Sequence, residues 1–192
     1  MKKFENFVLT QPDQEVTAIV GGEKKVVLFL KSGDGICWYA AQKEFSDDTV
    51  KIQYDSDGII RAVVDKPVPQ RGNVYAASML WPYNASVAEI AVADYPPGVT
   101  IDGTWRFDGK KIYRDAKLVS QRMLRMNTKT RTRNAAQAAL TIAMLQNRIS
   151  IGRARDGDTD ALTAWQHYLL DLDELTDAQL AAPDFAVPSA PQ

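Results

Sequence analysis

The sequence of 192 residues contains a single cysteine, Cys37, and a single histidine, His167. One cysteine excludes an internal disulfide, so packing alone must stabilise the fold, as suits a protein of a reducing cytosol. Cys37 lies in an aromatic stretch and is expected to pack as a small hydrophobe. General acid–base catalysis by His167 would need a carboxylate or nucleophile within reach, and the sequence names none. We therefore predict no catalytic residue and no enzyme.

Long apolar runs and a glycine-rich phosphate loop are also missing. The apolar run at residues 26–30 is far shorter than the ~20 residues that a membrane-spanning helix needs, so no membrane insertion is expected. Gly21-Gly22 falls between two strand-like runs and predicts a hairpin turn rather than a phosphate site. No cofactor is expected.

One segment has the spacing of a metal-binding loop. Residues 156–160 carry aspartate at alternate positions, which is how a calcium loop begins. The sixth position of that loop would be Ala161 instead of glycine, and the twelfth would be His167 instead of glutamate. We therefore expect no metal here, and expect Asp158 or Thr159 to cap a helix.

The two signs of charge nearly cancel over the chain, with 23 basic and 24 acidic residues, but they are segregated. Residues 106–133 hold ten basic and two acidic side chains, whereas residues 156–184 hold eight acidic ones and no lysine or arginine. A basic stretch near aromatic residues is typical of nucleic-acid binding. The acidic segment and the negative net charge favour two solvated faces of opposite sign instead, and we predict no nucleic-acid partner.

The first part of the chain has the pattern of β structure, in which short apolar or alternating runs are separated by glycine turns. The clearest hairpin turns at Asp57-Gly58, and a second turns at Asp108-Gly109. Strands are expected at residues 26–30, 36–39, 49–54, 59–64, 74–80, 87–93, 105–107 and 111–113.

From about residue 115 the apolar period becomes helical. Two apolar stripes on either side of a short polar connection at residues 153–158 predict an αα-hairpin, with Gly152 ending the first helix in a left-handed cap. Pro183 and Pro188 exclude helix and predict an extended strip that lies back over the helix pair. The expected core of the hairpin consists of Leu145, Ile149, Leu162, Trp165, Leu169 and Leu172.

Strands and helices are thus segregated along the chain, which predicts an α+β fold rather than α/β. We expect an N-terminal antiparallel β-rich domain at residues 1–114. A helical region with a hairpin and a proline-bracketed tail follows at residues 115–192.

Three separated blocks resemble the tail fibre assembly protein family of Mu-like and related contractile-tailed bacteriophages. The first runs from Ser32-Gly33-Asp34-Gly35 and Trp38-Tyr39 to Gly58-Ile59-Ile60. The second is the hairpin at residues 105–112. The third, and most specific, comprises Thr159-Asp160, Leu162, Trp165, Tyr168, Leu172 and the closing Pro183-Asp184-Phe185-Ala186-Val187-Pro188.

This resemblance implies a chaperone that binds the carboxy-terminal region of a trimeric tail fibre and promotes its folding or trimerisation in the cytoplasm of the bacterial host. The alternative is a component retained at the fibre tip of the virion, where it contacts cell-surface glycan. In the first case we expect the β-rich domain to dock the fibre through Trp38, Tyr39 and Tyr54, if these side chains face outward. Packing in the core is the competing expectation, and it is the favoured one for Trp38.

Overall fold

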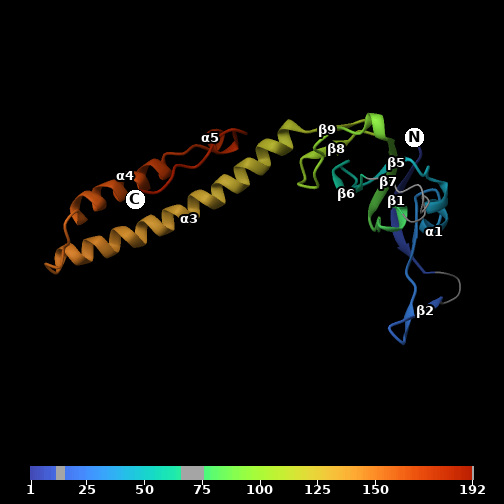
Figure 1. Cartoon of the computed structure of the whole chain (residues 1–192), viewed down its shortest axis with the longest axis horizontal. Helices are drawn as coiled ribbons and strands as arrows, with labels where there is room; N and C mark the ends of the chain where they lie inside the picture. The colour runs from blue at the N-terminus through green and yellow to red at the C-terminus, as the bar shows by residue number, and fades with distance from the viewer. Residues whose placement is uncertain (12–15, 66–75, 192) are drawn as a thin grey trace. The chain divides into compact units, whose positions relative to one another are not determined.

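The computed structural model describes residues 1–11, 16–65 and 76–191. The chain divides into two compact units, Met1–Asp115 and Ala116–Gln192. Strands dominate the first unit and helices the second (Figure 1), so the predicted α+β class is confirmed. None of the helices in the described part is long and apolar enough to cross a membrane.

An antiparallel sheet of five strands forms the centre of the first unit. Its order is β4-β1-β7-β5-β6, and the predicted hairpin around Asp57-Gly58 is confirmed as β5 and β6. The strands are β1 (Lys3–Thr10), β4 (Phe29–Lys31), β5 (Thr49–Tyr54), β6 (Ile60–Val64) and β7 (Ala85–Ala91). Strands β5 and β7 bury side chains on both faces of the sheet, because a separate apolar cluster covers each face.

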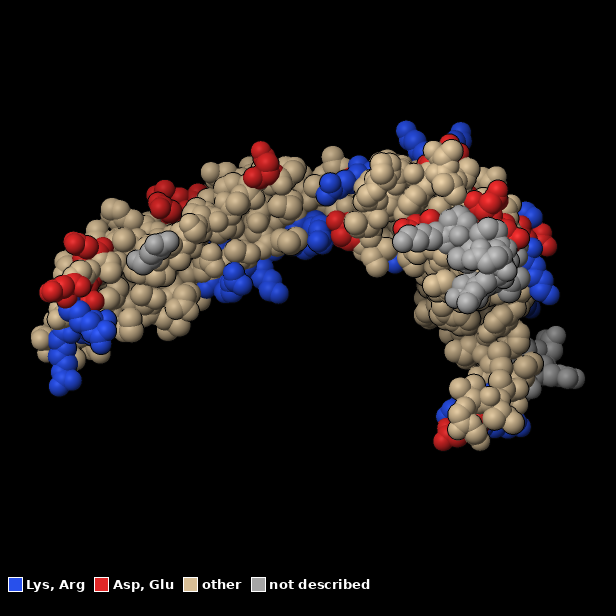
Figure 2. Space-filling model, viewed as in Figure 1, with Lys and Arg blue, Asp and Glu red and all other residues tan. Residues whose placement is uncertain are grey.

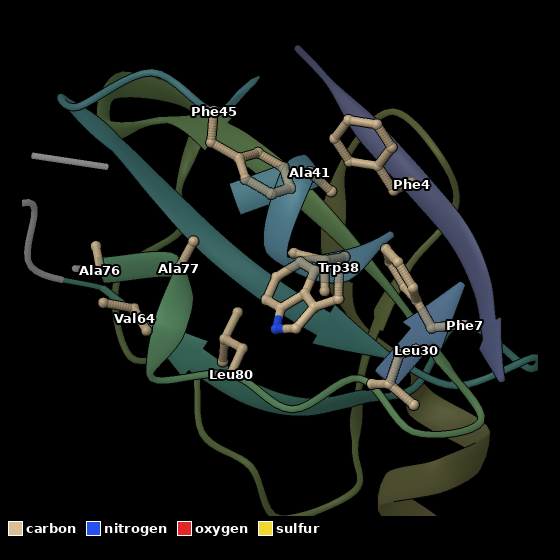
Figure 3. Close-up of a cluster of buried hydrophobic side chains, with 11 residues drawn as sticks. Phe4, Phe7, Leu30, Trp38, Ala41, Phe45, Val64, Ala76, Ala77 and Leu80 are labelled. Carbon is tan, nitrogen blue, oxygen red and sulfur yellow. The ribbon is translucent and has the colours of Figure 1, made fainter. Parts of the chain in front are cut away.

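One face of the sheet is covered by a cluster centred on Trp38 (Figure 3). Trp38 is fully buried and begins the short helix α1 (Trp38–Ala41), which the 3₁₀ turn η1 (Gln42–Glu44) continues. Its ring lies edge-on to Phe7, with ring centres 5.3 Å apart, and to Phe45 at 6.3 Å. These aromatic contacts tie α1 to strand β1 and to the loop that enters β5.

The opposite face is covered by a two-stranded hairpin of β8 (Trp105–Phe107) and β9 (Ile112–Arg114), as the sequence predicted. The 3₁₀ turn η3 (Val92–Asp94) follows β7. Phe107 packs edge-on to Tyr54, with ring centres 5.1 Å apart. The Arg106 guanidinium lies 3.0 Å from the Asp115 carboxylate, which holds the end of this hairpin within the first unit.

Two strand predictions were wrong, and a third holds only in part. Residues 38–41 are helical because sheet pairing ends at the bridge between Lys31 and Cys37, after which the Trp38 side chain turns into the core. In the run at residues 26–30, one strand ends at Val26 and another begins at Phe29, and only Leu30 is buried. Residues 76–78 are helical, and the rest of the strand predicted at 74–80 forms no described strand, with residues 74 and 75 outside the described part.

The second unit is a helical hairpin of α3 (Ala116–Ser150) and α4 (Asp158–Asp173), followed by the short helix α5 (Asp177–Ala181). Gly152 has a φ of 70°, and the N–H of Arg153 donates to the carbonyl of Arg148. A second bond runs from the Gly152 N–H to Ile149. This pair of bonds is a Schellman motif, so the predicted left-handed cap is confirmed.

The hairpin core lies between α3, α4 and the C-terminal tail. Leu145 and Leu172 are buried, and Trp165 and Leu169 pack against the buried cluster of Ala138, Tyr168 and Leu172. Ile149 and Leu162 are half-buried. Val187 from the tail contacts the same cluster, and the Tyr168 hydroxyl donates to the Pro188 carbonyl at 3.1 Å. The tail thus lies over the helix pair.

The end of the hairpin is fixed by an ion pair rather than by the expected side-chain cap. Gly157, with a φ of 84°, is the residue that caps α4, and no side chain caps it. The Asp158 carboxylate instead accepts a hydrogen bond from the Arg155 N–H at 2.8 Å and lies 2.8 Å from the Arg148 guanidinium. Asp158 therefore joins the start of α4 to the end of α3.

We expect Asp158→Asn to destabilise the helical unit by about 1 to 3 kcal/mol, because a largely buried guanidinium loses its carboxylate partner. Asp160→Asn is the matched control, since this exposed carboxylate occupies the same first turn and contributes only about 0.3 to 1 kcal/mol through the helix dipole. Urea unfolding followed by circular dichroism at the helical band measures both. Equal losses in the two variants would contradict a role for the ion pair.

We also expect Tyr168→Phe to loosen the tail at a cost of about 1 kcal/mol, because both the Pro188 carbonyl and the Asn134 side-chain amide lose their hydrogen-bond partner. Carboxypeptidase should then trim the chain faster than it trims the wild type. Tyr113→Phe, in the first unit, serves as the control. An unchanged trimming rate in Tyr168→Phe would show that apolar contacts alone hold the tail.

Candidate partner-binding surface

A two-stranded ribbon extends from the central sheet, and we call residues 8–11 and 16–31 the arm. Its outer part pairs β2 (Thr17–Val20) with β3 (Glu23–Val26), and its inner part pairs the end of β1 with β4. Gly21 and Gly22 form the connecting turn with φ angles of 61° and 84°. Two consecutive positive φ angles define the hairpin turn predicted from this glycine pair, which is confirmed.

Apolar side chains of the arm lie open to solvent. Ile19 is 80% exposed, and five more large apolar residues of the arm are about half exposed or more: Val8, Leu9, Val20, Val26 and Leu28. Figure 2 shows the arm as a mostly uncharged projection with its charged side chains gathered near the tip. Exposed apolar residues grouped on one element mark an interaction site rather than ordinary surface.

The backbone of the arm is also open. Among the described strands, β2 and β3 pair only with each other, so each has one edge with unpaired N–H and C=O groups. A two-stranded ribbon is marginally stable alone, and its edges can accept a strand from another chain. The arm therefore offers both apolar side chains and backbone hydrogen-bonding groups to a partner.

Of the three aromatic residues predicted to dock a partner, only Tyr39 faces outward. Tyr39 is 41% exposed, packs edge-on to Phe29 of the arm, and donates its hydroxyl proton to the Leu28 carbonyl at 3.2 Å. Trp38 and Tyr54 are buried in the two cores of the unit. Their side chains stabilise the fold. The sequence feature that could have indicated the arm is the Gly21-Gly22 turn between two strand-like runs.

Burial makes the phenol of Tyr54 a weaker acid than an exposed tyrosine. Desolvation, reinforced by the nearby Glu5 carboxylate, raises the pKa of the Tyr54 phenol to about 12. Its hydroxyl lies 3.5 Å from Glu5. The phenol therefore stays neutral to a higher pH than an exposed tyrosine does.

An open hollow of about 380 Å³ lies beside the β5–β6 turn, and polar side chains dominate its lining. Charged side chains of this lining stabilise the local fold. The Asp55 carboxylate accepts hydrogen bonds from the N–H groups of Asp57 and Ile59. The Arg106 guanidinium donates to the Asp57 backbone carbonyl and to the Asp115 carboxylate. No group of three or more metal-ligating side chains comes together within residues 1–11, 16–65 and 76–191. The hollow is thus built by turn structure.

The outer face of α3 carries a second row of exposed apolar residues, including Leu140, Met144 and Ile151 just beyond its end. The backbone groups of this helix are already paired within it. Only side chains are available there, whereas the arm presents side chains and backbone together. The arm is therefore the stronger candidate for a binding site.

A compact α+β unit that presents an open apolar ribbon has the features of a protein-interaction module. The comparison with known families gives the particular kind. The model described as "Caudovirales tail fibre assembly protein, lambda gpK" matches residues 40–192, and the chain belongs to this family. The match begins after the arm.

Individual relatives carry the same description. The chain is 29% identical over 148 residues to tail fiber assembly protein U of Escherichia phage Mu, covering 74% of this chain and 75% of the relative. It is 28% identical over 148 residues to the probable tail fiber assembly protein of Escherichia phage P2, with the same coverage. Tail fiber assembly protein U' of Escherichia phage P1 is 25% identical over 144 residues, or 72% of each chain.

The pKa of Tyr54 yields a test of its burial. Between pH 10 and 12 the unfolded chain releases the phenol proton while the folded chain keeps it, so this group makes the folded state less stable as the pH rises. From pH 9 to pH 11 we expect the wild type to lose about 1 kcal/mol more stability than Tyr54→Phe. Urea unfolding at both values measures the difference, and parallel losses in the two proteins would place Tyr54 in contact with water.

Proposed function

We propose that this chain is a tail fibre assembly chaperone that binds the carboxy-terminal region of a trimeric phage tail fibre and promotes its folding or trimerisation. The observation that carries this proposal is the exposed apolar arm in a chain of the tail fibre assembly family. The β-rich domain expected at residues 1–114 is the part that binds the fibre. The helical region after it packs as a unit of its own, Ala116–Gln192.

The physical need for such a protein lies in the fibre. A β-rich trimer must align three chains before its strand edges are paired, and unpaired edges aggregate in the meantime. A surface that covers one edge of each chain slows aggregation and leaves time for alignment. The site of action is the host cytoplasm, where fibre chains are made, and binding of this kind requires no catalytic step.

Co-expression tests the proposal. The tail fibre of the same phage is produced with and without the full-length chain, and its solubility and trimeric state are measured by sedimentation and size-exclusion chromatography with light scattering. We expect soluble trimer only in the presence of the chain. Soluble trimer formed equally well without it would contradict a chaperone function.

Mass spectrometry of purified phage particles gives the fate of the chain. A chaperone released after assembly is absent from the particle, and this is the result expected. A chain found in stoichiometric amount at the fibre would favour the alternative of a retained tip component that contacts cell-surface glycan.

A further inference from the structure

The direction of each backbone group in the arm follows from its register. The flanking residues Val20 and Glu23 of the two-residue turn form a hydrogen-bonded pair, and such pairs alternate with non-hydrogen-bonded ones along an antiparallel ribbon. The bond from the Val27 N–H to the Val16 carbonyl, 2.8 Å long, fits this alternation. The N–H and C=O groups of Lys24 and Val26 therefore point away from β2, toward the open edge.

Side chains along this edge form an apolar face. Lys24 and Val26 lie two residues apart in β3 and project from the same side of the ribbon, as does Ile19 opposite Lys24. Val26 and Leu28 are each more than half exposed. At the inner end, the hydroxyl of Tyr39 donates a hydrogen bond to the Leu28 carbonyl. The free edge is therefore limited to the segment before Leu28.

The two lysines of β3 differ in their ion pairing. Lys25 pairs with the Glu23 carboxylate, whereas Lys24 forms no ion pair with any residue that the structure describes. Lys24 is exposed at the outer end of the apolar face. A carboxylate on an incoming chain would complement it, next to an apolar side chain over Val26.

We propose that an extended strand of the tail fibre chain adds to the β3 edge of the arm and turns the two-stranded ribbon into a three-stranded sheet. This inference rests on the proposed function and specifies its contact. The added strand bonds to the N–H and C=O groups of Lys24 and Val26. It carries an apolar side chain over Val26 and an acidic side chain opposite Lys24. The edge is satisfied by the fibre strand that would otherwise aggregate.

Proline substitution separates this mode from side-chain contact. Val26→Pro removes an outward N–H and keeps the ribbon's own hydrogen bonds, and proline is tolerated at such edge positions. We expect it to weaken binding of the full-length chain to the carboxy-terminal segment of the fibre about tenfold or more, as measured by biolayer interferometry. Thr17→Pro is the matched control, because Thr17 lies directly opposite Val26 and the substitution removes an outward N–H on the opposite edge of the same ribbon. It should bind far more tightly than Val26→Pro.

A third variant tests the side chain alone. Val26→Thr keeps the N–H group and the preference for a strand, so its loss of affinity should be much smaller than that of Val26→Pro. Equal binding by Val26→Pro and the wild type would overturn the inference. A loss in Thr17→Pro with none in Val26→Pro would overturn it too, since the strand would then lie on the β2 edge.

Hydrogen exchange on the wild type gives a result that does not depend on how the variants fold. On binding the fibre segment, the amides of Lys24 and Val26 should become protected by a factor of about ten or more, because they move from water into a sheet. Tight binding without protection of these two amides would refute strand addition while leaving the chaperone proposal intact. A wild-type chain that does not bind the fibre segment at all would instead refute the proposed function.

Discussion

The edge-on packing of Phe7 against Trp38 is the contact on which the first unit depends. Phe4 and Phe7 are three residues apart and would face opposite sides of a regular strand. A register shift between them, with Asn6 at a φ of 56°, brings both into one core cluster. Phe7 is the last residue of β1 that pairs with β7, so the strand leaves the sheet directly from its best-anchored side chain. The arm, which is marginally stable by itself, is thereby attached to a well-packed part of the sheet.

In the helical unit, polar groups at the two ends of the apolar hairpin fix the position of its parts. The ion pair of Arg148 with Asp158 lies next to the interhelical loop, and the Tyr168 hydroxyl lies between Asn134 and the tail. Both are largely shielded from water, where leaving one partner unpaired is costly. They therefore fix the register of helices and tail, while the segregated surface charges on either side of the hairpin contribute little because water screens them.

The sequence predicts most of the fold because period and turn residues are local signals. The hairpin at Asp57-Gly58, the cap at Gly152 and the tail between two prolines are confirmed on that basis. What it misses depends on distant contacts. Whether Trp38 starts a helix is decided by the pocket between Phe7 and Phe45, and whether Val26 is buried depends on whether another element covers it. The apolar run at residues 26–30 is the signal of both a core strand and a binding strand, and composition cannot separate them.

The family match includes most of the packed scaffold but not the arm, and this boundary separates the supporting part of the chain from the candidate binding part. The match covers residues 40–192, which include α1 from its third residue, three strands of the main sheet and the whole helical unit. The arm lies entirely before it. A ribbon that contacts the main sheet only at its root can change its side chains without disturbing the packed cores, because its exposed residues contribute little to stability. If the arm binds the fibre, a change of fibre requires changes in the arm while the supporting scaffold is kept. Specificity would then reside in the element that depends least on the rest of the fold.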